Sequence, residues 1–287
     1  MSKTKRGVAL VTGASSGIGL ATARALRRDG YQVFGTSRKP AANTSDGVTM
    51  LVCDVTDDSS VQALVDHVVS RAARIDLLVN NAGIGLLGGA EESSAVQAKA
   101  LFEVNVFGVM RLTNAVLPVM RRQRGGRIVN LSSVLGLIPA PYSALYASTK
   151  HAIEGYSESL DHEVRTQGIR IVLVEPGGTR TSFEENLTRA DRPLAVYDAA
   201  RADAEKVMRE IVETGDAPEV VADMVVKAAN AATPRRRYTA GKVARQVSLM
   251  RRFLPESFVD KGLRKYNKLP LKLTPPASST SVAHQAT

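Results

Sequence analysis

Short apolar runs alternate along the first 240 residues with longer segments whose apolar positions recur at helical spacing. Most of the short runs are apolar on consecutive residues, as expected of strands that are covered on both faces. The pattern predicts an α/β fold: one doubly wound parallel sheet with right-handed crossovers and helices on both faces. The predicted strands are 7–13, 31–37, 48–55, 75–83, 126–133 and 169–178, with one more near 236–241. The predicted helices are 17–29, 58–73, 94–122, 145–167 and 200–232.

The chain changes character after residue 241, where we place the end of the main domain, residues 1–241. Val243, Val247, Met250 and Leu254 recur at helical spacing among basic residues, which predicts a basic amphipathic helix. We therefore expect a basic helical extension over 242–273, a candidate lid for a substrate. Residues 274–287 contain too few apolar side chains to pack, and we expect a disordered tail there.

Composition narrows the class of protein. The chain has 287 residues and is 44% hydrophobic, enough for a buried core. Cys53 is the only cysteine, which excludes an intrachain disulfide and predicts a cytoplasmic protein. The first residues imitate a signal peptide, but Gly and Ser interrupt the apolar run after Val11, so a strand, a turn and a helix are expected. We expect no run to approach the roughly 18 apolar residues of a membrane span, and the four scattered histidines predict no metal site.

The formal charge of +10 is unevenly distributed. From residue 234 onward there are twelve Lys and Arg residues and two acidic residues, so the rest of the chain is neutral. Few aromatic residues accompany these charges, which argues against a nucleic-acid partner. Two interpretations remain open for the basic helix: it packs on its own domain, or it contacts an anionic membrane surface.

A glycine-rich turn joins the first predicted strand to the first predicted helix. It reads TGASSGIG and places Gly13, Gly17 and Gly19 before the helix. Glycines there allow a sharp turn close to a pyrophosphate, and the N–H groups of the first helical turn face the negative charge. In this position the turn predicts a Rossmann-type dinucleotide-binding domain.

The end of the second predicted strand indicates which dinucleotide is bound. An NAD-specific site usually presents an acid there to the ribose 2′-hydroxyl, but residues 31–45 contain none. Ser37 and Arg38 can instead bind a 2′-phosphate, through charge-assisted hydrogen bonds worth about 1.5–3 kcal/mol each. We therefore expect NADP rather than NAD, the alternative being that Arg38 and Lys39 are ordinary solvated loop residues.

Tyr146 and Lys150 are candidate catalytic residues, because positions i and i+4 share one face of a helix. The pair alone could equally be a surface contact. Reduction of a ketone needs a hydride at carbon and a proton at oxygen. An ammonium about 4 Å from the phenol favours tyrosinate by roughly 4 kcal/mol at an effective dielectric of about 20, which would bring the pKa of Tyr146 near 7. Ser133 would join the pair from the end of a neighbouring strand.

Five motifs in this order resemble the short-chain dehydrogenase/reductase family. They are TGASSGIG, NNAG at 80–83 with Asn105, Ser133, the Tyr146-to-Lys150 segment, and PGGTRT at 176–181. The resemblance covers about residues 6–240 and is greatest to the branch of hydroxysteroid and retinol dehydrogenases and related bacterial oxidoreductases. It implies a homodimer, with a tetramer as an alternative, built on the long helices near 94–122 and 145–167.

The resemblance also implies a role for each matching residue. Tyr146 would be the acid or base, Lys150 its electrostatic partner, and Ser133 the group that orients the substrate oxygen. Asn105 would kink the long helix and hold a water beside the lysine. The residues implied to bind the cofactor are Gly13, Ser15, Ser16, Gly17, Ile18, Gly19, Ser37, Arg38, Asp54, Val55, Asn80, Ala82, Gly83, Tyr146, Lys150, Pro176, Gly177, Thr179 and Thr181.

Together these features predict an NADP-dependent oxidoreductase that interconverts a carbonyl and a secondary alcohol. An apolar, lipid-, steroid- or retinoid-like substrate is expected from Leu135, Leu137, Ile138 and Tyr142, which follow the catalytic serine. Those residues could also be ordinary loop packing. The alternative function is an NADP-binding sensor or scaffold that docks on anionic membrane through its basic extension.

Overall fold

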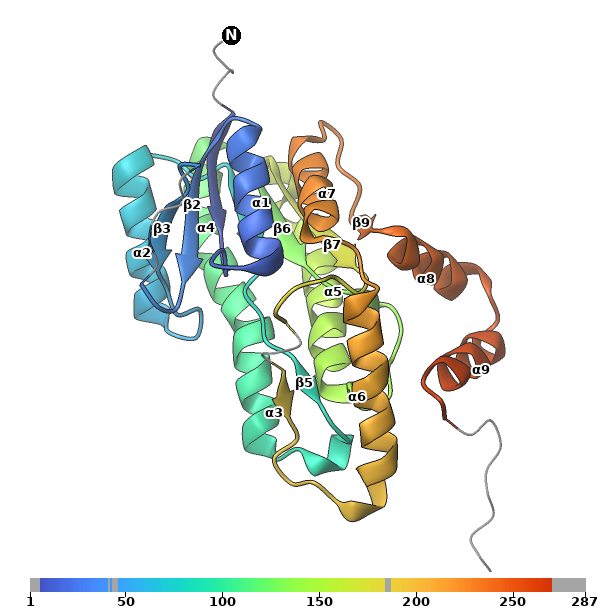
Figure 1. The fold of residues 1–287 in the computed structure, drawn as a ribbon. Helices are drawn as coiled ribbons and strands as arrows, with labels where there is room; N and C mark the ends of the chain where they lie inside the picture. The colour runs from blue at the N-terminus through green and yellow to red at the C-terminus, as the bar shows by residue number, and fades with distance from the viewer. Residues whose placement is uncertain (1–5, 41, 43–45, 184–186, 270–287) are drawn as a thin grey trace, which may run out of the picture.

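A seven-stranded parallel sheet forms the centre of the molecule, in the order β3-β2-β1-β4-β6-β7-β9 (Figure 1). The computed structural model describes residues 6–40, 42, 46–183 and 187–269. The strands are β1 (Gly7–Val11), β2 (Tyr31–Ser37), β3 (Thr49–Val52), β4 (Leu77–Asn80), β6 (Gly126–Leu131), β7 (Ile169–Pro176) and β9 (Arg237–Ala240). The predicted doubly wound parallel sheet, including the further strand near 236–241, is confirmed.

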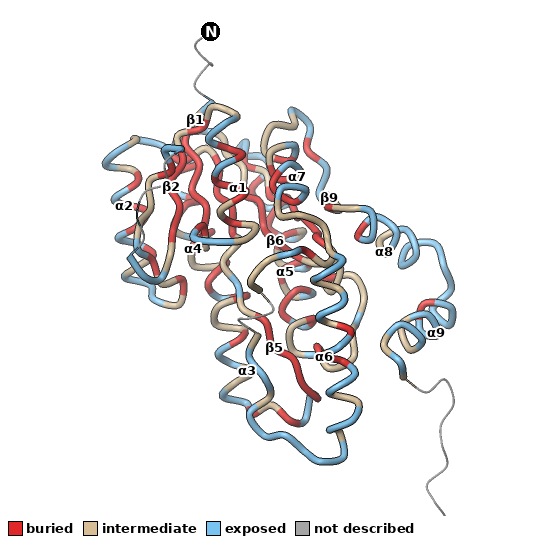
Figure 2. The backbone as a smooth tube through the Cα atoms, viewed as in Figure 1, coloured by how far each residue is buried: buried red, intermediate tan, exposed pale blue. Residues whose placement is uncertain are grey.

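Helices cover both faces of the sheet. On one face lie α1 (Gly17–Arg28) and α7 (Pro218–Asn230), and on the other lie α2 (Asp58–Ala72), α4 (Gly108–Gln123) and α5 (Ala144–Val164). Buried positions concentrate on the strands and on the helix faces toward them (Figure 2).

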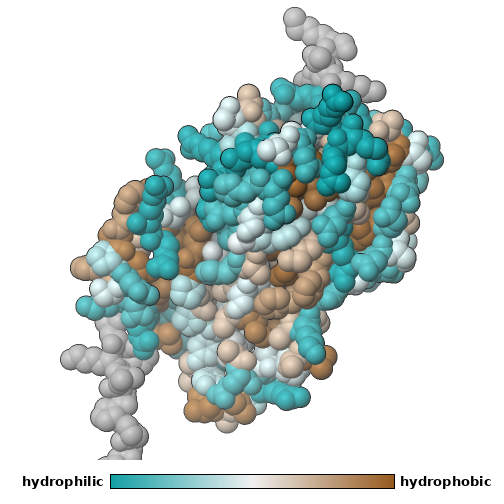
Figure 3. Space-filling view, turned by 180° about the vertical axis from the view of Figure 1, so that it is seen from behind, coloured by the Kyte–Doolittle hydropathy of each residue, from teal (hydrophilic) through white to brown (hydrophobic). Residues whose placement is uncertain are grey.

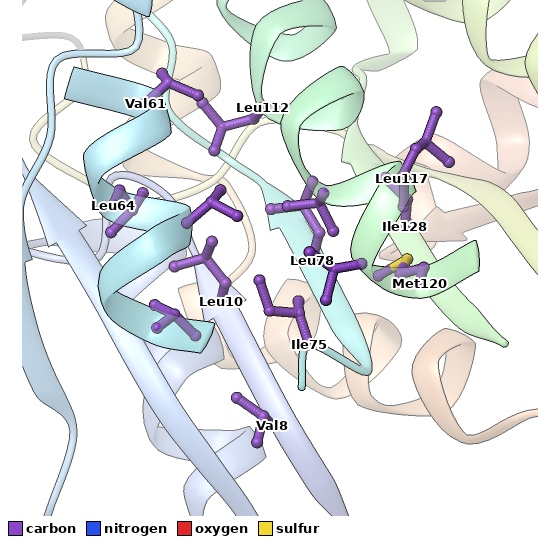
Figure 4. Close-up of a cluster of buried hydrophobic side chains, with 14 of the residues drawn as sticks. Val8, Leu10, Val61, Leu64, Ile75, Leu78, Leu112, Leu117, Met120 and Ile128 are labelled. Atoms are coloured by element: carbon purple, nitrogen blue, oxygen red, sulfur yellow. The ribbon is translucent and has the colours of Figure 1, made fainter. Parts of the chain in front are cut away.

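The core on the second face is built from strand residues in register. Leu10, Leu78 and Ile128 are partners across β1, β4 and β6, and each is completely buried. They lie between side chains of α2 and α4, such as Leu64 and Leu112 (Figure 4). Each such side chain contributes about 1.5–3 kcal/mol through its burial, so the sheet is a rigid platform for the residues that follow its strands.

The long predicted helix near 94–122 contains a break. It consists of α3 (Ala95–Phe102), a π-helical turn η2 (Glu103–Phe107) and α4. The continuous run Ala95–Gln123 is long and apolar enough to cross a membrane by length and composition, which the apolar pattern did not predict. Half of its most apolar stretch is buried inside the protein, as in the core helix of a globular domain.

The prediction of a single helix over 200–232 was wrong. The structure has α6 (Asp198–Glu213) and α7 in its place, because Gly215 falls between them and Pro218 begins α7, and a proline is tolerated only at the start of a helix. A small two-stranded sheet, which the pattern did not predict, pairs β5 (Leu86–Leu87) with β8 (Thr188–Arg189). The short helices are η1 (Ala90–Glu92), η3 (Val134–Gly136), η4 (Arg165–Gln167) and η5 (Ala195–Tyr197).

The C-terminal extension forms two helices that lead away from the sheet (Figure 1). The predicted amphipathic helix is α8 (Lys242–Phe253), and a second helix, α9 (Glu256–Tyr266), follows Pro255. Residues 270–273 of the expected extension and the expected tail 274–287 lie outside the described residues.

The sheet brings the predicted site residues to one edge. Gly13 follows β1, Asn80 ends β4, Ser133 follows β6 and Pro176 ends β7, all at the carboxyl ends of parallel strands. The chain runs from β1 outward to β3 and then returns to β4 on the other side of β1. Open α/β sheets bind ligands at the carboxyl ends of their strands, in the crevice at the point where the strand order reverses.

Candidate functional site

The turn after β1 forms a cradle with no room for side chains. Gly13 and Gly17 have φ angles of +63° and +52°, which favour glycine. A Cβ atom at Gly19 would lie 2.1 Å from the Gly13 carbonyl oxygen, so the helix can start close to the turn only with glycine there. Ser15 and Ser16 are exposed beside them, while Ile18 packs against the core.

The first turn of α1 keeps its N–H groups available. The side chain of Ser16, the residue that precedes the helix, makes no capping hydrogen bond with a described residue, and the first turn contains no acid. Uncapped N–H groups at a helix N-terminus bind phosphate through hydrogen bonds and the helix dipole. The cradle therefore fits the pyrophosphate of a dinucleotide.

Asn81, which the sequence analysis did not name, holds this turn in place. Its side-chain amide donates to the carbonyl oxygens of Thr12 and Gly13 at 3.0 and 3.2 Å. The Thr12 hydroxyl in turn accepts hydrogen bonds from the N–H groups of Asn81 and Ala82, both at 3.0 Å. The NNAG motif was the available signal, because two adjacent amide side chains end a buried strand there.

Asn80 has a different environment from the one expected. It is 4% exposed, and its amide donates to Asn130 at 2.8 Å and to Thr113 at 3.3 Å. Its side chain therefore links β4 to its neighbours inside the core, so a contact with a cofactor would involve its backbone. Gly83 lies against Asn105, since a Cβ atom there would be 3.3 Å from Asn105 Oδ1.

The end of β2 presents a positive charge. Arg38 is exposed and forms no ion pair with a residue that the structure describes, and the hydroxyl of the half-buried Ser37 accepts from the Lys39 N–H at 3.3 Å. Asp54 accepts from the N–H and hydroxyl of Thr56, which hold its pKa below the ordinary value, with a smaller contribution from Arg38. Asp54 and Arg38 are thus close and oppositely charged.

Val55 packs inward rather than toward the cofactor side. It is 7% exposed, and a Cβ atom at Gly108 would come within 2.8 Å of its side chain. The Val55 side chain therefore fills the space between the strand end and α4, so a contact with a cofactor would involve its backbone.

Lys150 reaches the sheet edge from α5. Its ammonium donates to the Leu131 carbonyl oxygen at 2.9 Å and lies 5.5 Å from the centre of the Tyr146 ring. Burial lowers the pKa of Lys150 to about 8, although the charge of Glu154 acts in the opposite direction. The structure thus brings together Tyr146 and Lys150 as the helical spacing predicted.

The pKa expected for Tyr146 was wrong. Burial raises the pKa of Tyr146 above 10, instead of the lysine lowering it toward 7. Burial is the cause of the shift, and the ammonium of Lys150 donates its hydrogen bond to the Leu131 carbonyl. Tyr146 is therefore a protonated phenol at neutral pH.

Ser133 begins the short η3 turn after β6. Its hydroxyl oxygen accepts from the Leu135 N–H at 3.1 Å, so its O–H hydrogen remains available to a substrate oxygen. Ser133 is half-buried, whereas Ser132 is 3% exposed and faces the interior. This difference in exposure favours Ser133 as the group that meets a ligand.

Asn105 lies in the π-helical turn and connects two parts of the site. It is 2% exposed, accepts from the Ile84 N–H at 2.9 Å and donates to the Ile84 carbonyl at 2.8 Å. It also donates to the hydroxyl of Thr149, the residue before Lys150, at 3.3 Å. The π-turn is the observed form of the predicted kink, and π-turns occur frequently at functional sites.

The segment after β7 returns to the glycine-rich turn. Gly17 and Thr181 are neighbours, since a Cβ atom at Gly17 would lie 3.2 Å from Thr181 Cγ2. Both line a cavity of about 370 Å³ between α1 and the start of α7. Thr179 is 9% exposed and donates to the Gly177 carbonyl, so its hydroxyl is already used within the turn.

One aromatic ring packs against Tyr146, and a second aromatic pair forms at Tyr142, four residues before it in the chain. The Phe183 ring lies 5.9 Å from that of Tyr146, and Tyr142 and Tyr197 meet edge to face at 6.2 Å. Of the residues expected to make an apolar wall, Leu135, Leu137, Ile138 and Tyr142 are all half-buried. Phe183 and Tyr197 were missed because their contacts depend on how the segment after β7 folds back.

Buried polar contacts hold that folded-back segment. Glu92, completely buried, accepts from the Leu194 N–H at 2.8 Å and pairs with Arg201 of α6. Asp191 accepts from the hydroxyl and the N–H of Ser94 at 2.6 and 2.8 Å. In the described part of the chain, no group of three or more His, Cys, Asp or Glu side chains could hold a metal ion.

The chain is similar to known proteins in sequence and in fold. The family profile described as short chain dehydrogenase matches residues 7–192. A 3-ketodihydrosphingosine reductase of Bacteroides thetaiotaomicron is 44% identical over 179 residues, which is 62% of this chain and 66% of that protein. Oxidoreductase YusZ of Bacillus subtilis is 38% identical over 275 residues, covering 90% of this chain and 97% of YusZ. Retinol dehydrogenase 8 of Bos taurus is 38% identical over 246 residues, 78% of each chain.

Solved structures give the same result. A short-chain dehydrogenase from Streptomyces avermitilis has a TM-score of 0.77 at 32% identity, covering 93% of this chain and 97% of its own. A short chain dehydrogenase/reductase from Burkholderia phymatum in complex with NAD has a TM-score of 0.76 at 28% identity, with 95% and 100% covered. A metagenomic short-chain oxidoreductase in complex with NADP has a TM-score of 0.67 at 27% identity, with 84% and 100% covered.

Proposed function

The chain belongs to the short-chain dehydrogenase family of oxidoreductases, which act on CH–OH groups, and from this premise we propose that it reduces an apolar ketone with NADPH. The observation that carries the proposal is the position of Tyr146, whose ring centre lies 5.5 Å from the ammonium of Lys150 and 5.9 Å from the centre of the Phe183 ring. A proton donor and an apolar contact surface meet there, at the ligand-binding edge of the sheet.

The residues of the glycine-rich cradle suit a dinucleotide. The uncapped N-terminus of α1 offers N–H groups to phosphate, and glycine at position 19 lets the helix start directly against the Gly13 carbonyl. When bound, the nicotinamide supplies the hydride for the carbonyl carbon. Gly17 is the candidate to lie near the phosphates of the cofactor, and Thr181 is the candidate to lie near its carboxamide.

We assign the preference for NADP to Arg38. Its exposed guanidinium, free of ion pairs with described residues, follows a strand whose end offers no acid to a ribose 2′-hydroxyl. The related structures include one complex with NAD and one with NADP, so the preference rests on Arg38 and Ser37 of this chain.

The protonation states fit the reductive direction. Tyr146, kept as a phenol by burial, can give its proton to the oxygen of a ketone. Lys150, charged below a pKa of about 8, then stabilises the tyrosinate that remains. Ser133, whose oxygen already accepts from the Leu135 N–H, can donate its hydrogen to the same substrate oxygen.

We propose a lipid-like substrate, on two grounds. The ring of Phe183 packs against that of Tyr146, and Tyr142, four residues earlier in the chain, pairs with Tyr197. The relatives include proteins named 3-ketodihydrosphingosine reductase and retinol dehydrogenase 8, both names of enzymes for long apolar molecules.

A substrate panel tests this proposal. Oxidation of NADPH is followed by absorbance with long-chain ketones and retinal, and with sugar ketones of similar reactivity as the polar control. We expect turnover of the apolar carbonyls and a much lower kcat/KM for the sugars. Turnover of the sugars alone would overturn the apolar assignment, and turnover with NADH alone would overturn the cofactor assignment.

A second proposal concerns the arm, defined as α8 and α9, which we propose contacts anionic lipid. Residues 242–268 contain eight Lys and Arg residues and two acidic residues. Hydrophobic side chains lie among hydrophilic ones on the arm, at the left of Figure 3. Phe253 is 69% exposed and Phe258 is 66% exposed. Exposed aromatic residues beside positive charge are typical of helices that lie in a membrane interface.

Liposome co-sedimentation tests the lipid contact. The protein should pellet with vesicles containing phosphatidylglycerol and stay in solution with phosphatidylcholine vesicles. Replacing both Phe253 and Phe258 by Ser should reduce the pelleted fraction severalfold. Absence of pelleting with the anionic vesicles would exclude this partner and favour a role of the arm as a lid or a protein interface.

We also propose a homodimer and a cytoplasmic location. The long helices α4 and α5 are the expected dimer surface, and Phe107, at the start of this region, is 46% exposed. Light scattering after size-exclusion chromatography should give twice the chain mass of 30.7 kDa. A monomer mass at micromolar concentration would contradict the dimer.

A further inference from the structure

A buried ionic cluster that the proposed reaction does not use lies behind Lys150. It contains Glu154 of α5, Glu175 of β7 and Arg237 of β9, and the two acids are 5% and 0% exposed. Arg237 Nε lies 2.9 Å from Glu154 Oε2 and 3.1 Å from Glu175 Oε1. Two carboxyl groups from separate elements thus share one guanidinium nitrogen.

The cluster has fewer positive charges than acids. Arg237 also pairs with Glu158 at 2.6 Å, and Glu158 lies 3.9 Å from the more exposed Arg236. Neither oxygen of Glu175 accepts a hydrogen bond from a described residue. A buried carboxyl group with no donor, next to another carboxylate, is stable as the neutral acid. Burial and the charge of Glu154 accordingly raise the pKa of Glu175 to about 8.

Glu154 lies next to two parts of the candidate active site, Lys150 and the loop that carries Ser133. It lies one helical turn after Lys150, and its charge raises the pKa of that lysine against the effect of burial. It also meets the loop that carries Ser133: a Cβ atom at Gly136 would lie 2.6 Å from Ser132 Oγ and 3.2 Å from Glu154 Oε1. The turn that Ser133 caps is therefore seated directly on Glu154, and only glycine at 136 allows this contact.

We propose that Glu154 is a positioning residue, which keeps Lys150 as an ammonium and seats the Ser133 turn, while Glu175 holds a proton and Arg237 fixes the carboxylate of Glu154. This proposal rests on the proposed function for its catalytic meaning. It also explains how β9, the strand that leads into the arm, is connected to the catalytic residues. Arg237 supplies that connection from the edge of the sheet.

The titration of Lys150 tests the proposal without a substrate. Its 13Cε chemical shift, assigned by comparison with Lys150→Arg, is followed against pH in the wild-type protein and in Glu154→Gln. The apparent pKa should fall by about one unit in Glu154→Gln, because a nearby negative charge is lost at constant size. Glu158→Gln is the matched control, since it removes the next acid along α5, which also binds Arg237. It should leave the titration within a few tenths of a unit, and an equal shift in both variants, or none in Glu154→Gln, would overturn the proposal.

A second measurement uses only the wild-type protein, so it does not depend on whether a variant folds. In the wild-type protein, the 13Cδ shift of Glu175 should titrate near pH 8 and that of Glu154 at lower pH. The reverse order would overturn the proposal. With a reducible ketone in hand, the loss of kcat/KM at alkaline pH should also begin about one pH unit lower in Glu154→Gln. Absence of any ketone reduction would refute the proposed function alone, because the NMR titrations report on Lys150 and the acids directly.

Discussion

Reversing the charge of Arg38 should reverse the cofactor preference. Arg38 is exposed at the end of β2, so one charge-assisted hydrogen bond to a 2′-phosphate is worth the lower end of the usual range, about 1.5–2 kcal/mol. In Arg38→Glu this bond is lost, and the new carboxylate repels the phosphate by about 1 kcal/mol at 4 Å in water. The total of about 3 kcal/mol corresponds to roughly 100-fold weaker binding of NADPH.

Fluorescence titration with each reduced cofactor measures this effect. The dissociation constant of NADPH should rise about 100-fold in Arg38→Glu by the reasoning above, while that of NADH should stay the same or fall, since Glu can accept the ribose 2′-hydroxyl. Lys39→Glu is the control, because it makes the same charge change at the next exposed residue. It should weaken NADPH only severalfold. Equal effects at both positions, or a wild-type protein that prefers NADH, would refute the assignment of the phosphate to Arg38.

Three further predictions concern the frame of the site. Gly19→Ala should abolish tight NADPH binding and lower the melting temperature, because the added Cβ would come 2.1 Å from the Gly13 carbonyl; unchanged cofactor titration would contradict this. Asn105→Ala should lower the free energy of unfolding in urea by about 2–5 kcal/mol, since the buried Asn105 loses two hydrogen bonds to Ile84; less than about 1 kcal/mol would refute it. Glu175 has a folded-state pKa raised from 4.5 to about 8, so the wild-type protein loses stability as pH rises through this window. The melting temperature of Glu175→Gln, relative to that of the wild type, should therefore increase as the pH rises from 4.5 to about 8. A difference that does not change with pH would exclude the raised pKa.

The sheet was predictable because consecutive apolar residues between turn signals admit few other interpretations. The glycine-rich turn and the Tyr146–Lys150 pair could also be predicted, since both depend on residues that are close together in the sequence. The split between α6 and α7 was missed although Gly215 and Pro218 mark it, because the apolar positions on both sides keep the same helical spacing. The π-turn at Asn105 has no such local signal: it depends on hydrogen bonds to Ile84 across the site.

Side-chain direction was the other limit of prediction. Asn80 and Asn81 are adjacent and identical, yet one turns into the core and the other supports the glycine-rich turn. Alternation along a strand separates the two faces, but the sequence does not say which face meets the cofactor. The partners of Glu154 come from elements 21 and 83 residues away in the chain, Glu175 and Arg237, and local spacing carries no information on such contacts.

The central claim is that Tyr146 gives the proton in an NADPH-dependent ketone reduction. The direct measurement compares kcat and NADPH affinity of the wild-type protein and Tyr146→Phe with an apolar ketone. General acid catalysis contributes about 10²–10⁴-fold, so kcat should fall by that factor while the dissociation constant of NADPH stays within about twofold. A Tyr146→Phe enzyme that retains wild-type kcat would contradict the account.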